Sequence, residues 1–209
     1  DEGIYCVSCH FLNGKMNGPY DLVAPPHPTY RNPDYVRSSF CGSCHQKTYK
    51  EWKGTGVEDT CQNCHMPRKK DRLTDKFPLS LLHKKKWVGN HKFLHGDLTE
   101  KDIILEADFK DKLFYFNLLN KTVPHNVPSA DNGDPRLYLY VTFLNEAGEQ
   151  VDQTKEILAP QQDTALPFNK KVRFSYRLFG LVAQANIVLK YQPAWSKEKD
   201  LVWEKTIRP

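Results

Sequence analysis

Every cysteine of this chain belongs to one of three copies of the same five-residue motif, Cys-x-x-Cys-His. Two residues separate the cysteines in each copy, and a histidine directly follows the second cysteine. Six cysteines are compatible with disulfides, with zinc sites or with another use, so their spacing has to decide between these. The three copies are Cys6-Val7-Ser8-Cys9-His10, Cys41-Gly42-Ser43-Cys44-His45 and Cys61-Gln62-Asn63-Cys64-His65.

This spacing favours covalent haem attachment. Two such thiols can each form a thioether with one vinyl group of a haem, and the adjacent histidine can then bind the iron. Zinc sites use Cys-x-x-Cys pairs but do not need a histidine directly after them, and a redox dithiol needs none. Three repeats therefore predict three covalently attached c-type haems. We expect attachment at Cys6, Cys9, Cys41, Cys44, Cys61 and Cys64, with His10, His45 and His65 as the proximal iron ligands.

The chemistry of attachment indicates the compartment. Thioethers form after export in c-type cytochromes, so we expect a periplasmic or extracellular chain whose export signal has been removed. The sequence contains no run of about 18 apolar residues that would span a membrane. A formal net charge of +5 is only a weak indication of acidic partners. We expect other redox proteins or identical subunits as partners, and no nucleic acid.

Residues 1–100 are expected to form a trihaem c-type cytochrome domain of loops and short helices. Prolines at 25, 26, 28 and 33 prevent long helices there, and short helices are expected at 43–52 and 79–86. Such a segment cannot bury a core of its own, so the three macrocycles would supply the core. Aromatic side chains are expected to pack around them: Phe11, Tyr20, Tyr30, Tyr35, Phe40, Tyr49, Trp52 and Trp87.

Residues 101–209 are predicted to form an immunoglobulin-like β-sandwich domain. Apolar and polar residues alternate there in seven segments, separated by turn sequences such as Asn132-Gly133-Asp134-Pro135 and Glu146-Ala147-Gly148. The expected fold class is therefore α+β, with a haem-packed N-terminal region followed by an antiparallel sandwich. The predicted strands cover 103–109, 112–120, 137–143, 150–158, 172–178, 183–191 and 201–207.

Each iron would have a second axial position to fill. Met66 directly follows a proximal histidine and cannot cross its own haem, whereas Met16 lies in a Gly/Asn-rich loop and is a weak candidate. His91 and His95 are four residues apart, so one helical turn would place them on one face. His125 is flanked by prolines in a loop between strands. The histidines outside the motifs are His27, His83, His91, His95 and His125.

The haem-binding half resembles secreted multihaem c-type cytochromes. The resemblance is strong from Ser38 to Gln46, at Glu51-Trp52, at Gly56-Val57, through Cys61–Pro67 and at His91-Lys92-Phe93. It implies His27, His91 and His125 as distal ligands, with His83 and His95 in reserve. In that group a β-domain often follows, with a Gly-His-x-x-Pro-Thr-Gly loop. The loop here, Pro124-His125-Asn126-Val127-Pro128-Ser129-Ala130, matches only at the histidine and the second proline.

Two functions remain open from the sequence. Bis-histidine haems have no free position for a substrate, so the first is an electron carrier, not an enzyme, in which electrons move along a row of low-spin haems. It could be a subunit of a larger redox assembly or of an extracellular cytochrome filament. The alternative is a multihaem oxidoreductase with one open haem, acting on a small nitrogen or sulfur substrate.

Overall fold

The computed structural model describes residues 4–23, 27–74, 76–93 and 96–209. The chain divides into two compact units, each assembled from two segments. Unit 1 comprises residues 1–44 and 58–95, and unit 2 comprises 45–57 and 96–209. Most regular structure is antiparallel sheet with a few short helices, which agrees with an α+β class. Within the described ranges, no helix is long and apolar enough to cross a membrane.

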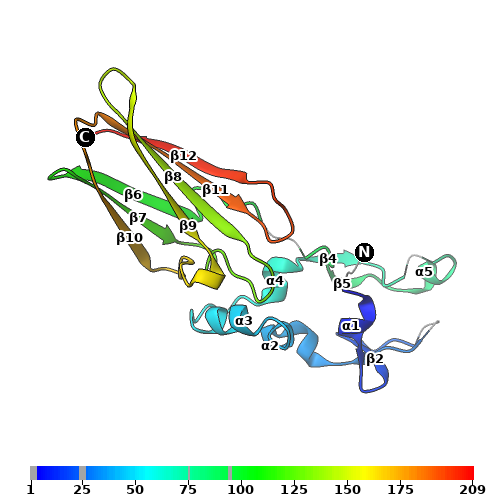
Figure 1. The fold of residues 1–209 in the computed structure, drawn as a ribbon. Helices are drawn as coiled ribbons and strands as arrows, with labels where there is room; N and C mark the ends of the chain where they lie inside the picture. Colours follow the sequence, from blue (N-terminus) through cyan, green and yellow to red (C-terminus); the bar gives the residue numbers. More distant parts are fainter. Residues whose placement is uncertain (1–3, 24–26, 75, 94–95) are drawn as a thin grey trace. The chain divides into compact units, whose positions relative to one another are not determined.

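Unit 1 consists of short elements (Figure 1). Three small strands pair in the order β1-β2-β3, and β4 pairs with β5 in an antiparallel hairpin. The elements are α1 (Cys6–His10), β1 (Phe11–Leu12), β2 (Lys15–Gly18), β3 (Tyr30–Arg31), the 3-10 helix η1 (Pro33–Val36), α2 (Ser38–Cys41), α4 (Cys61–His65), β4 (Arg68–Asp71), α5 (Leu79–Leu82) and β5 (Lys86–Gly89).

Unit 1 has almost no core of its own side chains. Among its described residues no large apolar side chain is buried, whereas the polar residues Ser38 and Gln62 are. Large apolar side chains are exposed instead, including Tyr5, Phe11 and Trp87. A segment that leaves this much apolar surface in water cannot offset the conformational entropy of folding by itself. Another apolar body is therefore needed to complete this unit.

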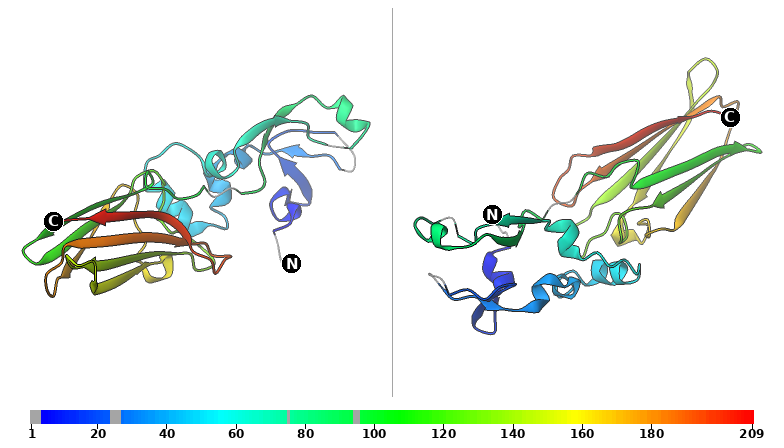
Figure 2. Two further views of the ribbon diagram at one scale, coloured as in Figure 1. Left: turned by 90° about the horizontal axis from the view of Figure 1, so that it is seen from above. Right: turned by 180° about the vertical axis from the view of Figure 1, so that it is seen from behind.

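Unit 2 contains two antiparallel sheets, with strand orders β10-β7-β6 and β12-β11-β8-β9 (Figure 2). All seven strands predicted from alternation are present, within a residue or two of the expected ends. Gly133 and Gly148 have positive φ angles in the predicted turns. The strands are β6 (Ile103–Lys110), β7 (Leu113–Asn120), β8 (Arg136–Leu144), β9 (Gln150–Leu158), β10 (Lys171–Arg177), β11 (Gln184–Gln192) and β12 (Asp200–Ile207), and the 3-10 helix η2 (Pro160–Gln162) follows β9.

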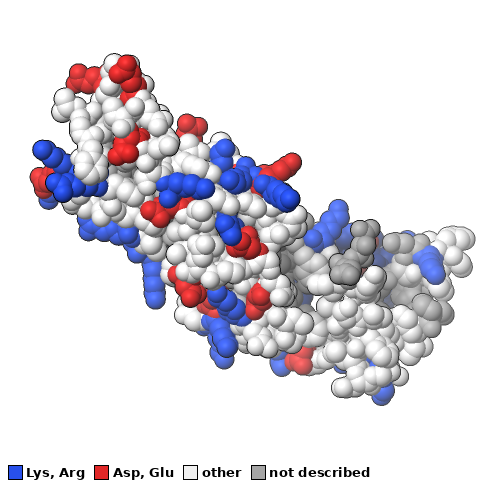
Figure 3. Space-filling view, viewed as in Figure 1, with Lys and Arg blue, Asp and Glu red and all other residues white. Residues whose placement is uncertain are grey.

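The apolar core of the chain lies between these sheets. Trp203 of β12 donates its indole N–H to the Ile103 carbonyl of β6 at 3.0 Å, which joins one sheet to the other. On the outside, acidic and basic side chains are interspersed across the visible face of unit 2 (Figure 3). The fully buried core side chains include Phe114, Phe116, Leu118, Leu137, Leu139, Phe143, Ile187 and Leu189.

Two helix predictions need correction. The expected helix over 79–86 ends at Leu82, and Lys86 already belongs to β5, where it pairs with Asp71. The expected helix over 43–52 begins only at Gln46 and ends at Lys53; this is α3 (Gln46–Lys53). His91 lies in a turn, and His95 lies outside the described residues, so the predicted helical pairing of these two histidines is not tested.

Candidate haem-attachment sites

Each Cys-x-x-Cys-His motif forms one helical turn. The first and third motifs coincide with α1 and α4, and Thr60 caps α4 by accepting the Asn63 N–H at 3.3 Å. The second motif begins at the last residue of α2, and the Cys44 N–H donates to the Cys41 carbonyl at 3.2 Å. Residues three apart share one face of such a turn. All six thiols are free, and each is exposed or half-buried.

His10 is held in the tautomer that suits a metal ligand. Its Nδ1 lies 2.7 Å from the Asn17 carbonyl oxygen, and a carbonyl can only accept, so Nδ1 carries the proton. This leaves the lone pair on Nε2, the nitrogen that would face a metal. A second partner that orients a ligating histidine in this way is typical of metal sites. The geometry at His10 therefore fits an axial ligand.

A second imidazole lies opposite this one. The ring centroids of His10 and His91 are 5.9 Å apart, at an interplanar angle of 43°. With metal–nitrogen bonds of about 2 Å, two imidazoles on opposite sides of one ion have centroids roughly 6 Å apart. The structure thus brings together a predicted proximal ligand and a predicted distal ligand at a suitable separation.

Tyr35 links the first motif to the second. Its ring stacks on His10 with a centroid separation of 5.1 Å and contacts Phe40, the residue before Cys41, at 4.4 Å. Its hydroxyl donates to the Cys9 carbonyl. One side chain therefore contacts the first motif and the residue that directly precedes the second.

Residues that lead into the second motif are hydrogen-bonded to the third. The Ser38 hydroxyl accepts the Cys61 N–H at 3.1 Å, and the buried Gln62 amide donates to the Arg37 carbonyl at 2.7 Å. The Cys41 thiol is hydrogen-bonded to Cys61; this bond raises the pKa of Cys41 and lowers the pKa of Cys61 to about 6. A lowered pKa makes a thiol more nucleophilic near neutral pH.

His45, the histidine of the second motif, belongs to unit 2 together with α3. Asp131, in the loop before β8, accepts the backbone N–H groups of Lys47 at 2.6 Å and Thr48 at 3.3 Å. Burial opposes the charge of Asp131, but these bonds hold the pKa of its carboxyl below the usual value. Glu51 accepts the Ser129 hydroxyl at 2.7 Å. The helix that follows His45 is therefore fastened to the loop at 121–131.

That loop carries His125. Its Nδ1 lies 2.8 Å from the Asn126 carbonyl, so Nε2 again keeps the lone pair. The Asn120 side chain, which is fully buried, donates to the His125 carbonyl at 2.7 Å and to the Val123 carbonyl at 3.0 Å. Glu51 of α3 accepts the Asn126 N–H at 3.2 Å. These bonds hold the histidine loop against the helix that begins next to His45.

The remaining candidates are not placed with a motif. His27 is exposed, and His83 is half-buried just after α5. Neither makes a hydrogen bond, ion pair or ring contact in the part of the chain that the structure describes. Met16 lies in β2, paired with Phe11. Across the described residues, no three His, Cys, Asp or Glu side chains converge as a metal cluster.

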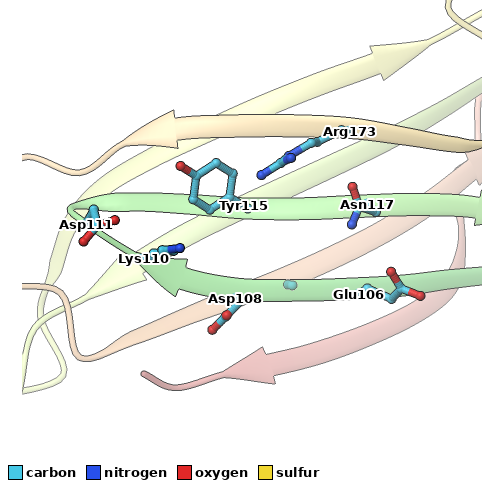
Figure 4. Close-up of a pocket in the computed structure, with 8 residues that line it drawn as sticks. Glu106, Asp108, Lys110, Asp111, Tyr115, Asn117 and Arg173 are labelled. Carbon is cyan, nitrogen blue, oxygen red and sulfur yellow. The ribbon is translucent and has the colours of Figure 1, made fainter.

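A polar groove lies elsewhere, on the outer face of the β10-β7-β6 sheet (Figure 4). Its charged groups interact with one another and with an aromatic ring: Lys171 contacts Glu106 at 2.6 Å, and Arg173 lies over Tyr115 at 4.6 Å. This is how the outward residues of a solvated strand pair. The lining residues are Glu106, Ala107, Asp108, Lys110, Asp111, Tyr115, Asn117 and Arg173.

No protein-family model matches the chain, and no curated protein matches its sequence. Among solved structures, it is similar to the crystal structure of a penta-haem cytochrome c552 from Thermochromatium tepidum. The TM-score is 0.60 at 16% identity, and the match covers 95% of this chain and 69% of that one. The chain has the fold of a multihaem cytochrome c. At this level of identity the similarity shows the fold alone.

Proposed function

We propose that the chain carries three c-type haems, one at each Cys-x-x-Cys-His motif, and transfers electrons between redox partners outside the cytoplasm. When bound, each haem supplies a one-electron couple. The observation that supports this most directly is the contact between motifs in unit 1. Tyr35 contacts His10 of the first motif and Phe40, which directly precedes the second. Cys61 and Gln62 of the third motif are hydrogen-bonded to Ser38 and Arg37, which lead into the second. Three attachment turns held this closely favour electron exchange among them.

The axial ligands are assigned within the compact units. His10 and His91 are paired for the first motif, because their ring centroids lie 5.9 Å apart. His45 and His125 are paired for the second, because α3 and the histidine loop are hydrogen-bonded within unit 2. The resemblance to multihaem cytochromes then leaves His27 for His65 of the third motif, with His83 and His95 in reserve.

These assignments argue for an electron carrier over an enzyme. Each iron would have an imidazole on both faces and no free position for a substrate. Export of the chain to the periplasm or the cell exterior is part of the same proposal. So is its place as a subunit of a larger redox assembly or filament. Tyr5, directly before the first motif, and Val7, within it, are exposed apolar side chains that a partner could cover.

Electron paramagnetic resonance of the oxidised protein, with haem quantified on the same sample, tests this function. Three low-spin haems per chain are expected. A high-spin signal from a third of the haem would mean an open iron. The same sample at several concentrations, with a small nitrogen or sulfur substrate added, would then show whether that iron is catalytic or lacks a ligand from a neighbouring subunit.

A further inference from the structure

A buried carboxylate lies beside the histidine of the second motif. The Asp131 Oδ2 atom is 3.8 Å from Nδ1 of His45, and only 10% of the Asp131 side chain is exposed, against 60% of His45. At this distance the two groups interact electrostatically without a hydrogen bond. The carboxylate comes from the loop before β8 and the imidazole from the residue that precedes α3, both within unit 2.

The position of Asp131 is fixed by the helix that follows His45. Its two carboxylate oxygens accept the backbone N–H groups of Lys47 and Thr48, and Oδ2 also accepts the Thr48 hydroxyl at 2.9 Å. The Lys47 ammonium donates to the Pro160 carbonyl at 2.6 Å and lies 3.7 Å from Asp163. The positive charge of Lys47 is therefore directed to Pro160 and Asp163.

The first motif offers an internal comparison. The Nδ1 of His10 faces a neutral carbonyl, that of Asn17, at 2.7 Å. The Nδ1 of His45 faces a negative charge. Groups behind a ligating histidine change its basicity and so adjust the metal it binds. An anion near the imidazole stabilises the ferric state, with its extra positive charge, more than the ferrous state.

We propose that Asp131 is a positioning residue that sets the second haem to a lower reduction potential than a neutral group at its place would give. The inference rests on the proposed function, because it requires a haem at Cys41 and Cys44. One electron reduces the ferric iron, and Asp131 remains an ionised carboxylate throughout.

The test is a potentiometric titration of the haem-loaded chain and four variants. Asp131→Asn removes the charge and keeps an oxygen that can accept from the Lys47 N–H. We expect one of the three potentials to rise while the other two stay in place, with three low-spin haems retained. Asp131→Glu should return that potential towards the wild-type value, because it restores the charge.

Two controls separate charge from structure. Asp163→Asn removes a carboxylate that is 94% exposed, near the same lysine, and should leave all three potentials unchanged. Thr48→Val removes one hydrogen bond between Asp131 and α3 but keeps the charge of Asp131. It should therefore lower the unfolding midpoint and leave all three reduction potentials unchanged. An equal shift in Thr48→Val would assign the effect to helix capping and overturn the inference.

The remaining outcomes are also decisive. Three unchanged potentials in a loaded Asp131→Asn protein would refute this inference and leave the proposed function intact. A wild-type chain without haem at the second motif would refute both. If Asp131→Asn fails to fold, Asp131→Glu becomes the test. Its three reduction potentials must match those of the wild type, because the charge is kept. A rise in the potential of the second haem in this variant would contradict the role of the carboxylate.

Discussion

The imidazole of His91 lies near that of His10, with ring centroids 5.9 Å apart, although 80 residues of sequence separate them. The Asn17 carbonyl accepts from Nδ1 of His10, and Tyr35 stacks on its ring. His91 has an edge contact with Phe93 at 6.4 Å. The proposed function takes these two imidazoles as the axial ligands of the first haem.

Replacing His91 with alanine should open the first iron. The expected result is conversion of one haem in three from low-spin to high-spin, with three haems still attached, because the thioethers at Cys6 and Cys9 do not depend on His91. Electron paramagnetic resonance of the oxidised variant measures this. His91→Met should instead keep the iron low-spin and raise one potential, because methionine ligation favours the ferrous state.

The matched control for His91 is His83→Ala, since His83 touches no motif in the described structure. It should leave all three haems low-spin, whereas His27→Ala should open the third. A low-spin spectrum in His91→Ala, or a high-spin signal in His83→Ala, would contradict the assignment of axial ligands.

Tyr35 should contribute to stability in two separable ways. Tyr35→Phe removes the hydrogen bond to the Cys9 carbonyl and keeps the ring, so we expect a loss of about 1 kcal/mol in the free energy of unfolding. Tyr35→Ala also removes the ring contacts with His10 and Phe40 and should cost more. Denaturant unfolding of the loaded proteins compares them. Equal losses in both variants would mean that the ring packing contributes nothing.

Asn120 should couple the sandwich to His125. Asn120→Ala leaves the carbonyls of Val123 and His125 without their buried donor, which should cost about 1–3 kcal/mol. The loosened loop should also give a partial high-spin signal from the second haem. Lys121→Ala, next to it but exposed, is the control and should change neither measurement. A destabilised variant with a fully low-spin spectrum would argue against His125 as a ligand.

The strands of unit 2 could be predicted from the sequence because burial alternates along much of their length. In β7 the buried residues are Phe114, Phe116, Leu118 and Asn120, with half-buried ones between them. The strands of unit 1 could not. The β4 strand, Arg-Lys-Lys-Asp, has no apolar alternation, and its pairing with β5 follows from chain geometry rather than composition. The immunoglobulin-like classification and a boundary at residue 100 stay predictions.

The sequence predicts the residues of the candidate site, and these stay predictions, but it does not predict their surroundings. The motif spacing points to six thiols and three histidines because the chemistry of haem attachment depends on local sequence alone. That α3 is attached to the sandwich depends on contacts between Thr48 and Asp131, 83 residues apart, for which no local pattern exists. The contact between the rings of His91 and His10 is non-local in the same way. Contacts between residues this far apart in the sequence are known only once the fold is known.

Asp102 should make unit 2 sensitive to acid. Burial opposes its charge, but hydrogen bonds from Thr122 and Thr99 hold the pKa of its carboxyl below the usual value. A lowered folded-state pKa stabilises the protein above the unfolded value of about 3.9, and this contribution is lost as the pH falls through the folded pKa. Asp102→Asn should therefore lower the unfolding midpoint at pH 7 and converge with the wild type near pH 2. A difference that stayed constant between these pH values would contradict the electrostatic origin.

The most direct test of the central claim is the intact mass of the denatured chain. Covalent attachment at every motif predicts the polypeptide mass plus three haems, and Cys61→Ala combined with Cys64→Ala should reduce this to two. A denatured chain at the bare polypeptide mass, or one carrying zinc in its native state in place of haem, would contradict the assignment of the three motifs.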